Sequence, residues 1–203
     1  MSASTKKAAA SISFLTVLDQ GDDGLFGGYL VLNAAGRPLE FHCTAPVKAN
    51  RAQQILYGRT LAPYLYGEQI GQTLIGKAKT SPRWICTDVQ PALAVRDYVA
   101  TPVALVLEAP SAVHEEQEES PSSGDSTSSK TWRLDAARET APRPHAASLL
   151  EFELGGFALA VSPTWGDDRE TVKSLWREFA GLDLLEPFAR IREAIEEAQK
   201  AAR

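Results

Sequence analysis

The residue types that perform catalysis are few in this 203-residue chain, and their spacing excludes several common reaction classes. The chain has two cysteines, Cys43 and Cys86, which form no Cys-x-x-Cys pair, and three histidines. His42 and Cys43 are adjacent, but zinc needs four ligands and nothing supplies the other two. No Gly-x-Ser-x-Gly motif occurs, and Gly27-Gly28 is not followed by the Gly-Lys-Ser/Thr of a phosphate-binding loop. Serine or cysteine hydrolases, zinc sites and P-loops are therefore not predicted.

Two carboxylates stand at the ends of predicted strands, Asp19 after residues 11–18 and Asp88 after residues 84–87. An aspartate in this position usually accepts backbone hydrogen bonds in a turn, so the simplest interpretation is structural. Gln53 follows Asn50 by three residues, which is the spacing of a capping box at a helix start. Whether these residues do chemistry depends on the elements that position them.

The first half of the chain predicts an α/β unit. Three segments rich in β-branched and aromatic residues, joined by short turns, predict an antiparallel meander. A helical period follows, interrupted by Gly58 and Pro63. A short strand, a brief helix and a further strand then give a parallel βαβ pattern. The predicted strands are 11–18, 29–32, 39–44, 84–87 and 102–108, and the predicted helices are 50–57, 60–78 and 91–98.

The second half begins differently, because residues 111–147 are acidic and rich in Ser and Pro. Such a composition cannot bury a core and predicts a disordered insertion, within which Trp132 and Leu134 leave open a short helix that docks on a partner. From residue 148 a hairpin around Gly155-Gly156 and two amphipathic helices are expected, with cap residues predicted for both. The cap pairs are Asp167 with Glu170 and Asp183 with Glu186. The expected organisation is a disordered N-terminus (1–10), an α/β core (11–110), the insertion (111–147) and a segment completing the same domain (148–203).

The order of elements over residues 11–108 resembles the ribonuclease H-like fold, and four short motifs support the resemblance. An Asp ends the first strand, and Gly27-Gly28-Tyr29 opens the second. Asn50-Arg51-Ala52-Gln53 opens the first helix, as Asn-Arg-x-Glu does in ribonucleases H. Thr87-Asp88-Val89-Gln90 ends the fourth strand and is similar to their Asp-x-Gln. The resemblance implies a sheet with the third strand at an edge, followed by the second, the first and the fourth.

The resemblance also implies which residues would act in an enzyme. Two-metal hydrolysis needs several carboxylates around a pair of Mg²⁺ ions, because hard cations prefer anionic oxygen ligands. Asp19 and Asp88 are the candidate ligands, but the position that resembles the bridging Glu is Gln53, a neutral amide. No motif matches the last ligand of the family. The acidic residues that could replace it are Glu40, Glu68, Asp97 and the pair Asp167 and Asp168.

These observations favour a cytoplasmic interaction or scaffold module with a degenerate ribonuclease H-like fold, no cofactor and another protein as partner. One alternative is a metal-dependent nuclease or phosphotransfer enzyme that uses Mg²⁺ at Asp19 and Asp88, and another is a small ligand-binding module of unrelated α+β type. A net charge of -5 does not indicate nonspecific nucleic-acid binding, although a local basic patch is compatible with it. No apolar run is long enough to span a bilayer, and the cysteine usage is that of a reducing compartment.

Overall fold

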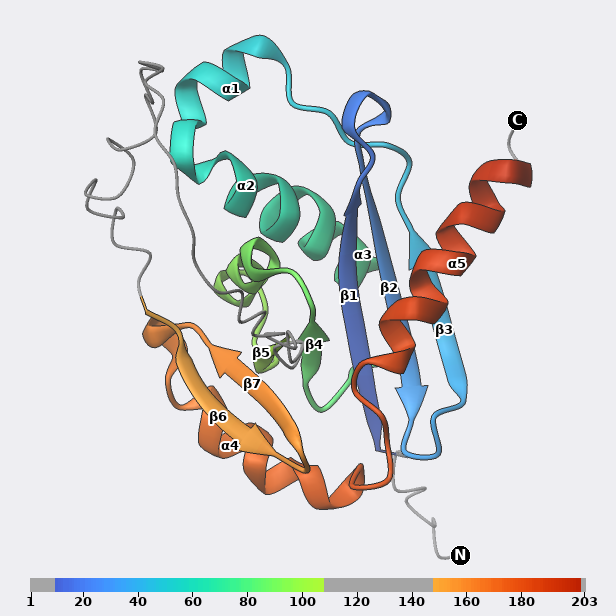
Figure 1. Cartoon of the computed structure of the whole chain (residues 1–203), viewed down its shortest axis with the longest axis vertical. Coiled ribbons are helices and arrows are strands. Elements are labelled where there is room, and N and C mark those ends of the chain that lie inside the picture. The colour runs from blue at the N-terminus through green and yellow to red at the C-terminus, as the bar shows by residue number, and fades with distance from the viewer. Residues whose placement is uncertain (1–9, 108–147, 202–203) are drawn as a thin grey trace, which may run out of the picture.

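A single mixed sheet organises the protein, whose computed structural model describes residues 10–107 and 148–201. Seven strands lie in the order β3-β2-β1-β4-β5-β7-β6 (Figure 1). The β1–β2–β3 meander is antiparallel, β1, β4 and β5 are parallel, and β7 pairs antiparallel with both β5 and β6. The strands are β1 (Ser11–Asp19), β2 (Leu25–Asn33), β3 (Pro38–Cys43), β4 (Ile85–Thr87), β5 (Val103–Leu107), β6 (Leu150–Leu154) and β7 (Phe157–Val161).

The order β3-β2-β1-β4 is the one that the ribonuclease H resemblance implies, and the predicted α/β fold class is confirmed. The C-terminal hairpin extends this sheet, because β7 pairs directly with β5. The expectations for residues 1–9 and 111–147, including the segment around Trp132, lie outside the described residues. No helix in the described part of the chain is long and apolar enough to cross a membrane.

The helical segments differ from prediction mainly between Gly58 and Lys77. Gly58 ends α1 with φ 49°, as its interruption of the pattern predicted. Pro63 does not end the helical path, which continues through a π-helical stretch. The helical elements are α1 (Arg51–Tyr57), α2 (Leu61–Pro63), α3 (Thr73–Lys77), α4 (Asp168–Leu175) and α5 (Glu186–Ala201), the π-helix η3 (Tyr64–Gln72), and the 3-10 helices η1 (Gly21–Asp23), η2 (Gly58–Thr60), η4 (Gln90–Asp97), η6 (Pro163–Trp165) and η7 (Trp176–Glu178).

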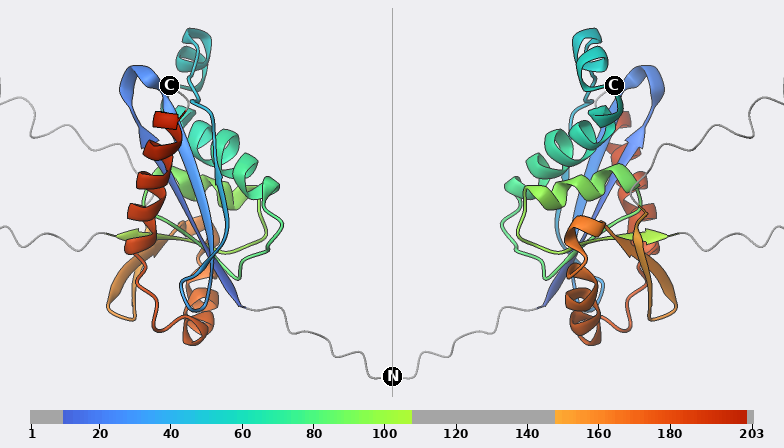
Figure 2. Two further views of the ribbon diagram at one scale, coloured as in Figure 1. Left: turned by 90° about the vertical axis from the view of Figure 1, so that its right-hand side faces the viewer. Right: turned by 90° about the vertical axis from the view of Figure 1, so that its left-hand side faces the viewer.

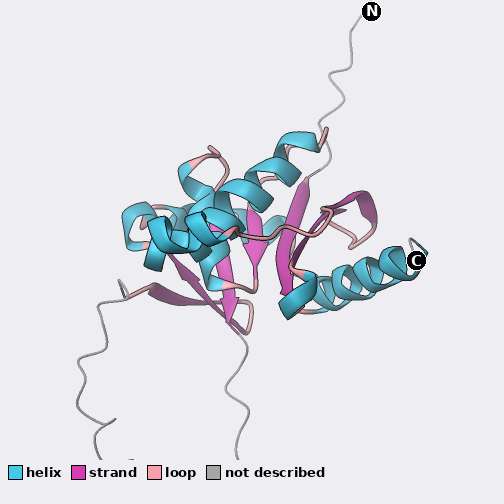
Figure 3. Cartoon of the chain, turned by 90° about the horizontal axis from the view of Figure 1, so that it is seen from above, coloured by secondary structure: helices cyan, strands magenta, loops and turns pink. Residues whose placement is uncertain are grey.

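Helices cover both faces of the sheet, and each face has its own apolar core. Figure 2 shows α5 on one side of the strands and the helices from α1 to α3 on the other, and Figure 3 shows the two layers from above. Residues of α4 and α5 pack with Phe14 and Trp84 on one face. Residues of η3, α3 and η4 pack with Leu15 and Tyr29 on the other face. Alternate side chains along a central strand therefore enter opposite cores.

Gly27 and Gly28 lie inside β2 and allow both helical layers to approach its backbone. A Cβ atom at Gly27 would lie 2.1 Å from Cγ2 of Ile70, and one at Gly28 would lie 2.2 Å from Cγ2 of Ile191. Neither distance is possible for a real side chain, so both positions require glycine. The prediction that β2 begins near Tyr29 is corrected accordingly: it begins at Leu25, because these glycines serve helix packing rather than a turn.

The caps predicted for the two C-terminal helices have different outcomes. The Asp183 carboxylate accepts hydrogen bonds from the backbone N–H groups of Leu185 (2.8 Å) and Glu186 (3.3 Å), so the Asp183 half of this cap is confirmed. The Glu186 side chain pairs with Arg190 instead of closing the cap. The predicted pair of Asp167 and Glu170 is wrong, because Asp167 makes no side-chain cap at α4. Glu170 pairs instead with Lys173 and Arg169 on the exposed side of the helix.

Candidate functional site

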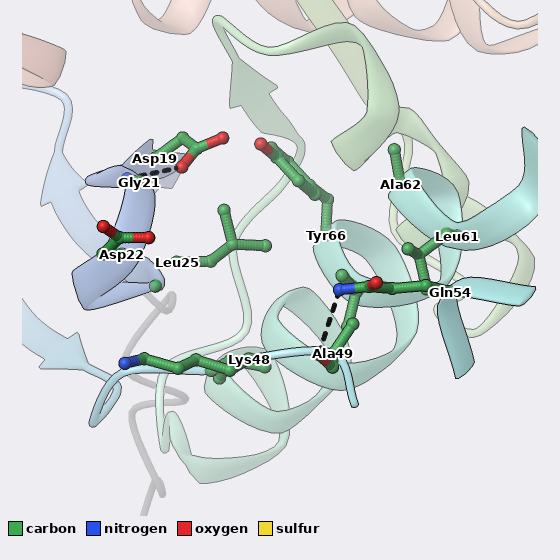
Figure 4. Close-up of a pocket in the computed structure, with 13 residues that line it drawn as sticks. Asp19, Gly21, Asp22, Leu25, Lys48, Ala49, Gln54, Leu61, Ala62 and Tyr66 are labelled. Atoms are coloured by element: carbon green, nitrogen blue, oxygen red, sulfur yellow. Dashed lines mark hydrogen bonds between the residues drawn. The ribbon is translucent and has the colours of Figure 1, made fainter. Parts of the chain in front are cut away.

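An open cavity of about 440 Å³ lies at the carboxyl end of β1 (Figure 4). It is formed by the turn after β1, the stretch 47–49 after β3, and the helical path from α1 to η3. Ligands in α/β sheets commonly bind beyond the carboxyl ends of the strands, so this is the first place to test for a site. The polar side chains lining it are Asp19, Asp22, Lys48, Gln54 and Tyr66, and the apolar ones include Leu25, Leu61 and Leu65.

Asp19 is the candidate residue that faces this cavity. Its Oδ1 accepts a hydrogen bond from the backbone N–H of Gly21 at 2.9 Å, as expected of a turn aspartate. Figure 4 shows the hydroxyl of Tyr66 directed toward this carboxylate. Partial burial and then the negative charge of Asp19 raise the pKa of Tyr66, so the phenol is a protonated donor at neutral pH. The cavity thus combines an acid and a hydroxyl donor.

Asp88 lies on the other face of the sheet. Its side chain is 6% exposed and bonds to the guanidinium of Arg192 on α5. Leu15 pairs with Thr87, so Asp88 lies one position beyond this pair and Asp19 four positions beyond it. The two acids are therefore offset by three residues, about 10 Å along the strands. They are also separated by the sheet, since α5 and the helices lining the cavity cover opposite faces.

Gln53 serves as a helix cap. Its side-chain Oε1 accepts from the backbone N–H of Asn50 at 2.9 Å, and its own backbone N–H donates to Asn50 Oδ1 at 2.8 Å. Both bonds of the capping box predicted from the sequence are present. The neighbouring Gln54, and not Gln53, lines the cavity, where its amide donates to the carbonyl of Ala49 at 3.4 Å.

Four of the acids considered as replacement ligands are engaged elsewhere in the structure, and the fifth, Asp167, does not line the cavity. Among residues 10–107 and 148–201, no group of three or more His, Cys, Asp or Glu side chains is placed to hold a metal ion. The structure therefore does not bring the sequence candidates together. Glu68 accepts from the hydroxyl of Tyr98, Asp97 from the indole of Trp165, and Asp168 from Arg96, while Glu40 binds the loop before β4.

The Glu40 carboxylate is the most strongly perturbed of these acids. Hydrogen bonds from the Thr80 side chain, from the backbone N–H of Lys79 and from His42 lower its pKa from the ordinary 4.5 to about 2. The Lys79 bond is 2.9 Å long, and the backbone N–H of Thr80 donates at 2.6 Å. Glu40 thereby ties the segment after α3 to the edge strand β3, which is a structural role.

Lys48 and Tyr66 were not predicted as site residues. Lys48 lies in a stretch without periodicity, and Tyr66 lies within the predicted helix 60–78, where no motif marks it. The only sequence signal was that Tyr66 and Asp19 both occupy the first α/β unit. Their meeting depends on how η3 packs across β1, which is a tertiary feature.

Comparisons with known proteins identify neither a family nor a role for any residue. No family model matches the chain, and no curated protein matches it. Among solved structures, a match is found to endonuclease V of Ciona intestinalis, crystallised with a 24mer DNA containing an inosine followed by a ribo-adenosine. The identity is 10% and the TM-score 0.27, over 51% of this chain and 48% of the other. The chain thus aligns with about half of that protein, and at this similarity no residue is matched to a role.

Proposed function

We propose that this protein is a protein-interaction module built on a ribonuclease H-like fold, and that it docks on its partner through α1. The observation that carries the proposal is the exposure of two consecutive apolar residues on this helix. Ile55 is 65% exposed and Leu56 is 81% exposed, and α1 contributes no residue to either core. Figure 1 shows α1 at one end of the molecule, away from the strands.

Other contacts hold α1 in place despite its lack of a buried face. A seven-residue helix is not stable by itself in water, because nucleation costs more than so few hydrogen bonds return. Here the capping box at Asn50 and Gln53 stabilises its start, and the ring of Tyr57 stacks on that of Tyr64 at 4.1 Å. The chain therefore presents a preformed helix with apolar side chains in water, which is typical of a binding surface.

The segment that carries α1 is basic, whereas the nearby acids Asp22 and Glu68 come from other segments. The charge of this segment specifies the partner further. Residues 47–67 contain Lys48, Arg51 and Arg59 but no Asp or Glu, although the whole chain has a net charge of -5. Arg51 precedes Ile55 by four residues and so lies on the same side of the helix. The complementary surface is an apolar pocket on another protein with carboxylates at its rim.

The positions of the candidate acids support binding over hydrolysis. Asp19 and Asp88 face opposite sides of the sheet, and Gln53 is a neutral capping residue. A metal-dependent nuclease or phosphotransfer enzyme is the second candidate. It is favoured by the open cavity that contains Asp19 and Asp22 at the carboxyl end of β1.

The test compares protein partners captured by the full chain and by an Ile55→Ser/Leu56→Ser variant. Both side chains are exposed, so the free energy of unfolding should change by no more than about 0.5 kcal/mol. The matched control is Leu185→Ser, which removes an exposed leucine before α5. A partner retained by the control and lost by the α1 variant supports the proposal. Equal capture by both variants, or Mg²⁺-dependent cleavage of RNA or DNA that Asp19→Asn abolishes, would overturn it.

A further inference from the structure

A second surface is an apolar groove of about 470 Å³ between α5 and the edge strand β3. Its apolar lining includes Leu30 of β2, Phe41 of β3, and Ile191 and Ala194 of α5. Phe41 pairs with Leu30 across the β2–β3 ladder, so both project from the face that α5 covers. The groove is therefore a continuation of the apolar core toward the edge of the sheet.

The groove exists because the helical layer ends one strand before the sheet does. Helix α5 packs on β1 and β2, whose side chains on this face are buried. Phe41 of β3, on the same face, is 38% exposed. Neighbouring helices lie about 8–10 Å apart, so one further helix beside α5 would cover β3. Figure 1 shows α5 running obliquely across this side of the sheet, with the beginning of β3 to one side of it.

The edge strand itself is poorly suited to accept another strand. Pro38 removes a backbone donor from β3, and the β2–β3 register shifts between Val31 and Leu32. Proline and bulges at a sheet edge are the features that hinder strand addition. An incoming chain would therefore bind over the face of β3 as a helix.

The rim of the groove on α5 is acidic. Glu193 and Glu197 lie one helical turn apart and both line the groove. The guanidinium of Arg190 also borders it, but it is engaged by the Glu186 carboxylate at 2.7 and 3.1 Å and by the carbonyl of Gly36 at 3.3 Å. Glu197 is itself paired with Lys200, whose Nζ lies 3.4 Å from its carboxylate. With both pairs counted, Glu193 gives the rim one net negative charge.

We infer that this groove binds an amphipathic helix of another protein, with apolar residues at i, i+3, i+4 and i+7 and with Lys or Arg along its edges. The apolar stripe would contact Phe41 and Ala194, and the basic residues would lie against Glu193 and Glu197. The inference goes beyond the proposed function, because it uses a different surface and the opposite charge.

The experiment measures binding of a fluorescent synthetic helix of about five turns to the full chain by anisotropy. The peptide carries leucines at the stated spacing and lysines along both edges, and its control has glutamates in place of the lysines. Saturable binding of the lysine peptide, weakened by salt, is expected. Binding of both peptides alike would overturn the inference, because the rim would then play no part.

Two variants locate the site. Phe41→Ser should weaken binding at least about tenfold, because it removes the exposed apolar anchor. Glu193→Lys/Glu197→Lys changes only exposed side chains and should reverse the preference toward the glutamate peptide, by about tenfold. Ile55→Ser/Leu56→Ser should leave peptide binding unchanged, so failure at the groove and failure at α1 are distinguished.

Other occupants would give recognisable results. Self-association in light scattering that Phe41→Ser abolishes would show that a second copy covers the groove. Peptide binding that appears only after deletion of residues 111–147 would show that the chain covers its own groove. Either result would overturn the inference of a separate partner.

Discussion

The ion pair of Asp168 and Arg96 joins the C-terminal segment to the βαβ unit, and we predict that Asp168→Ala strongly destabilises the fold. The carboxylate accepts from Nε of Arg96 at 2.7 Å, from its Nη2 at 3.1 Å, and from the backbone N–H of Val103 at 3.2 Å. The two side chains are only 6% and 13% exposed. Its substitution removes all three bonds and leaves a buried cation.

The loss of unfolding free energy in Asp168→Ala depends on which partners Arg96 keeps. Its Nη1 still donates to the carbonyl of Val99 at 2.7 Å, and its guanidinium lies 4.0 Å from the centre of the Trp165 ring. Breaking a buried pair from one side typically costs about 3–5 kcal/mol, since the remaining charge stays desolvated. We expect a loss of about 4 kcal/mol for Asp168→Ala. At about 2–4 °C per kcal/mol for a domain of this size, the midpoint falls by about 8–16 °C.

Urea unfolding followed by circular dichroism measures the loss, and a double variant tests its cause. Arg96→Leu combined with Asp168→Ala removes both charges, so it should be less destabilising than the sum of the single variants by about 1–3 kcal/mol. The exposed pair of Arg83 and Glu178 is the matched control, and Glu178→Ala should cost less than about 1 kcal/mol. Additivity within about 0.5 kcal/mol at Arg96 and Asp168 would refute the reasoning.

Three further predictions concern other elements. Glu40→Gln should lower the unfolding free energy near neutral pH, because hydrogen bonds from Thr80 and its neighbours lower the pKa of Glu40. The stability that a lowered pKa contributes is present above the ordinary value of 4.5 and is lost as the pH falls toward 2. In urea titrations the difference in unfolding free energy between variant and wild type should therefore close over that pH range. Gly28→Ala should cost about 1–3 kcal/mol by overpacking against α5, and an unchanged urea midpoint would contradict that packing. Two strands lie between the strand of Cys43 and that of Cys86, so the two residues are about 14 Å apart, too far for a disulfide. Thiol titration after mild oxidation should therefore find both thiols free. An intramolecular disulfide would contradict the strand order.

The fold was predictable because the apolar patterns and turn residues of the sequence agree with the observed strand order. The segment 11–18 alternates residues that enter the two cores, and Gly36, with φ 73°, closes the turn to β3 as expected. The start of β2 was not predictable, since Gly27 and Gly28 have turn composition and their role appears only with the helices on both faces. The π-helix after Pro63 likewise has no distinct sequence signal.

The candidate site was less predictable than the fold, because two acids at strand ends meet only if they project to the same face. For Asp19 the preceding residues of β1 are buried on both faces, so hydropathy does not indicate the face. For Asp88 the preceding strand has three residues, all buried, so hydropathy gives no alternation to follow. Its partner Arg192 lies in α5, more than a hundred positions along the chain. Only the three-dimensional structure places Asp88 on the face opposite Asp19.

The two proposed surfaces need partners of opposite charge, so their interactions can be tested separately in one protein. Helix α1 lies in a stretch with three basic residues and no acidic ones, whereas the groove beside α5 has Glu193 and Glu197 at its rim. A single partner with one sign of charge cannot satisfy both surfaces equally. If both are used, the partner of α1 is acidic and the helix in the groove is basic. Substitutions at Ile55 and Leu56 would then abolish the first interaction and preserve the second.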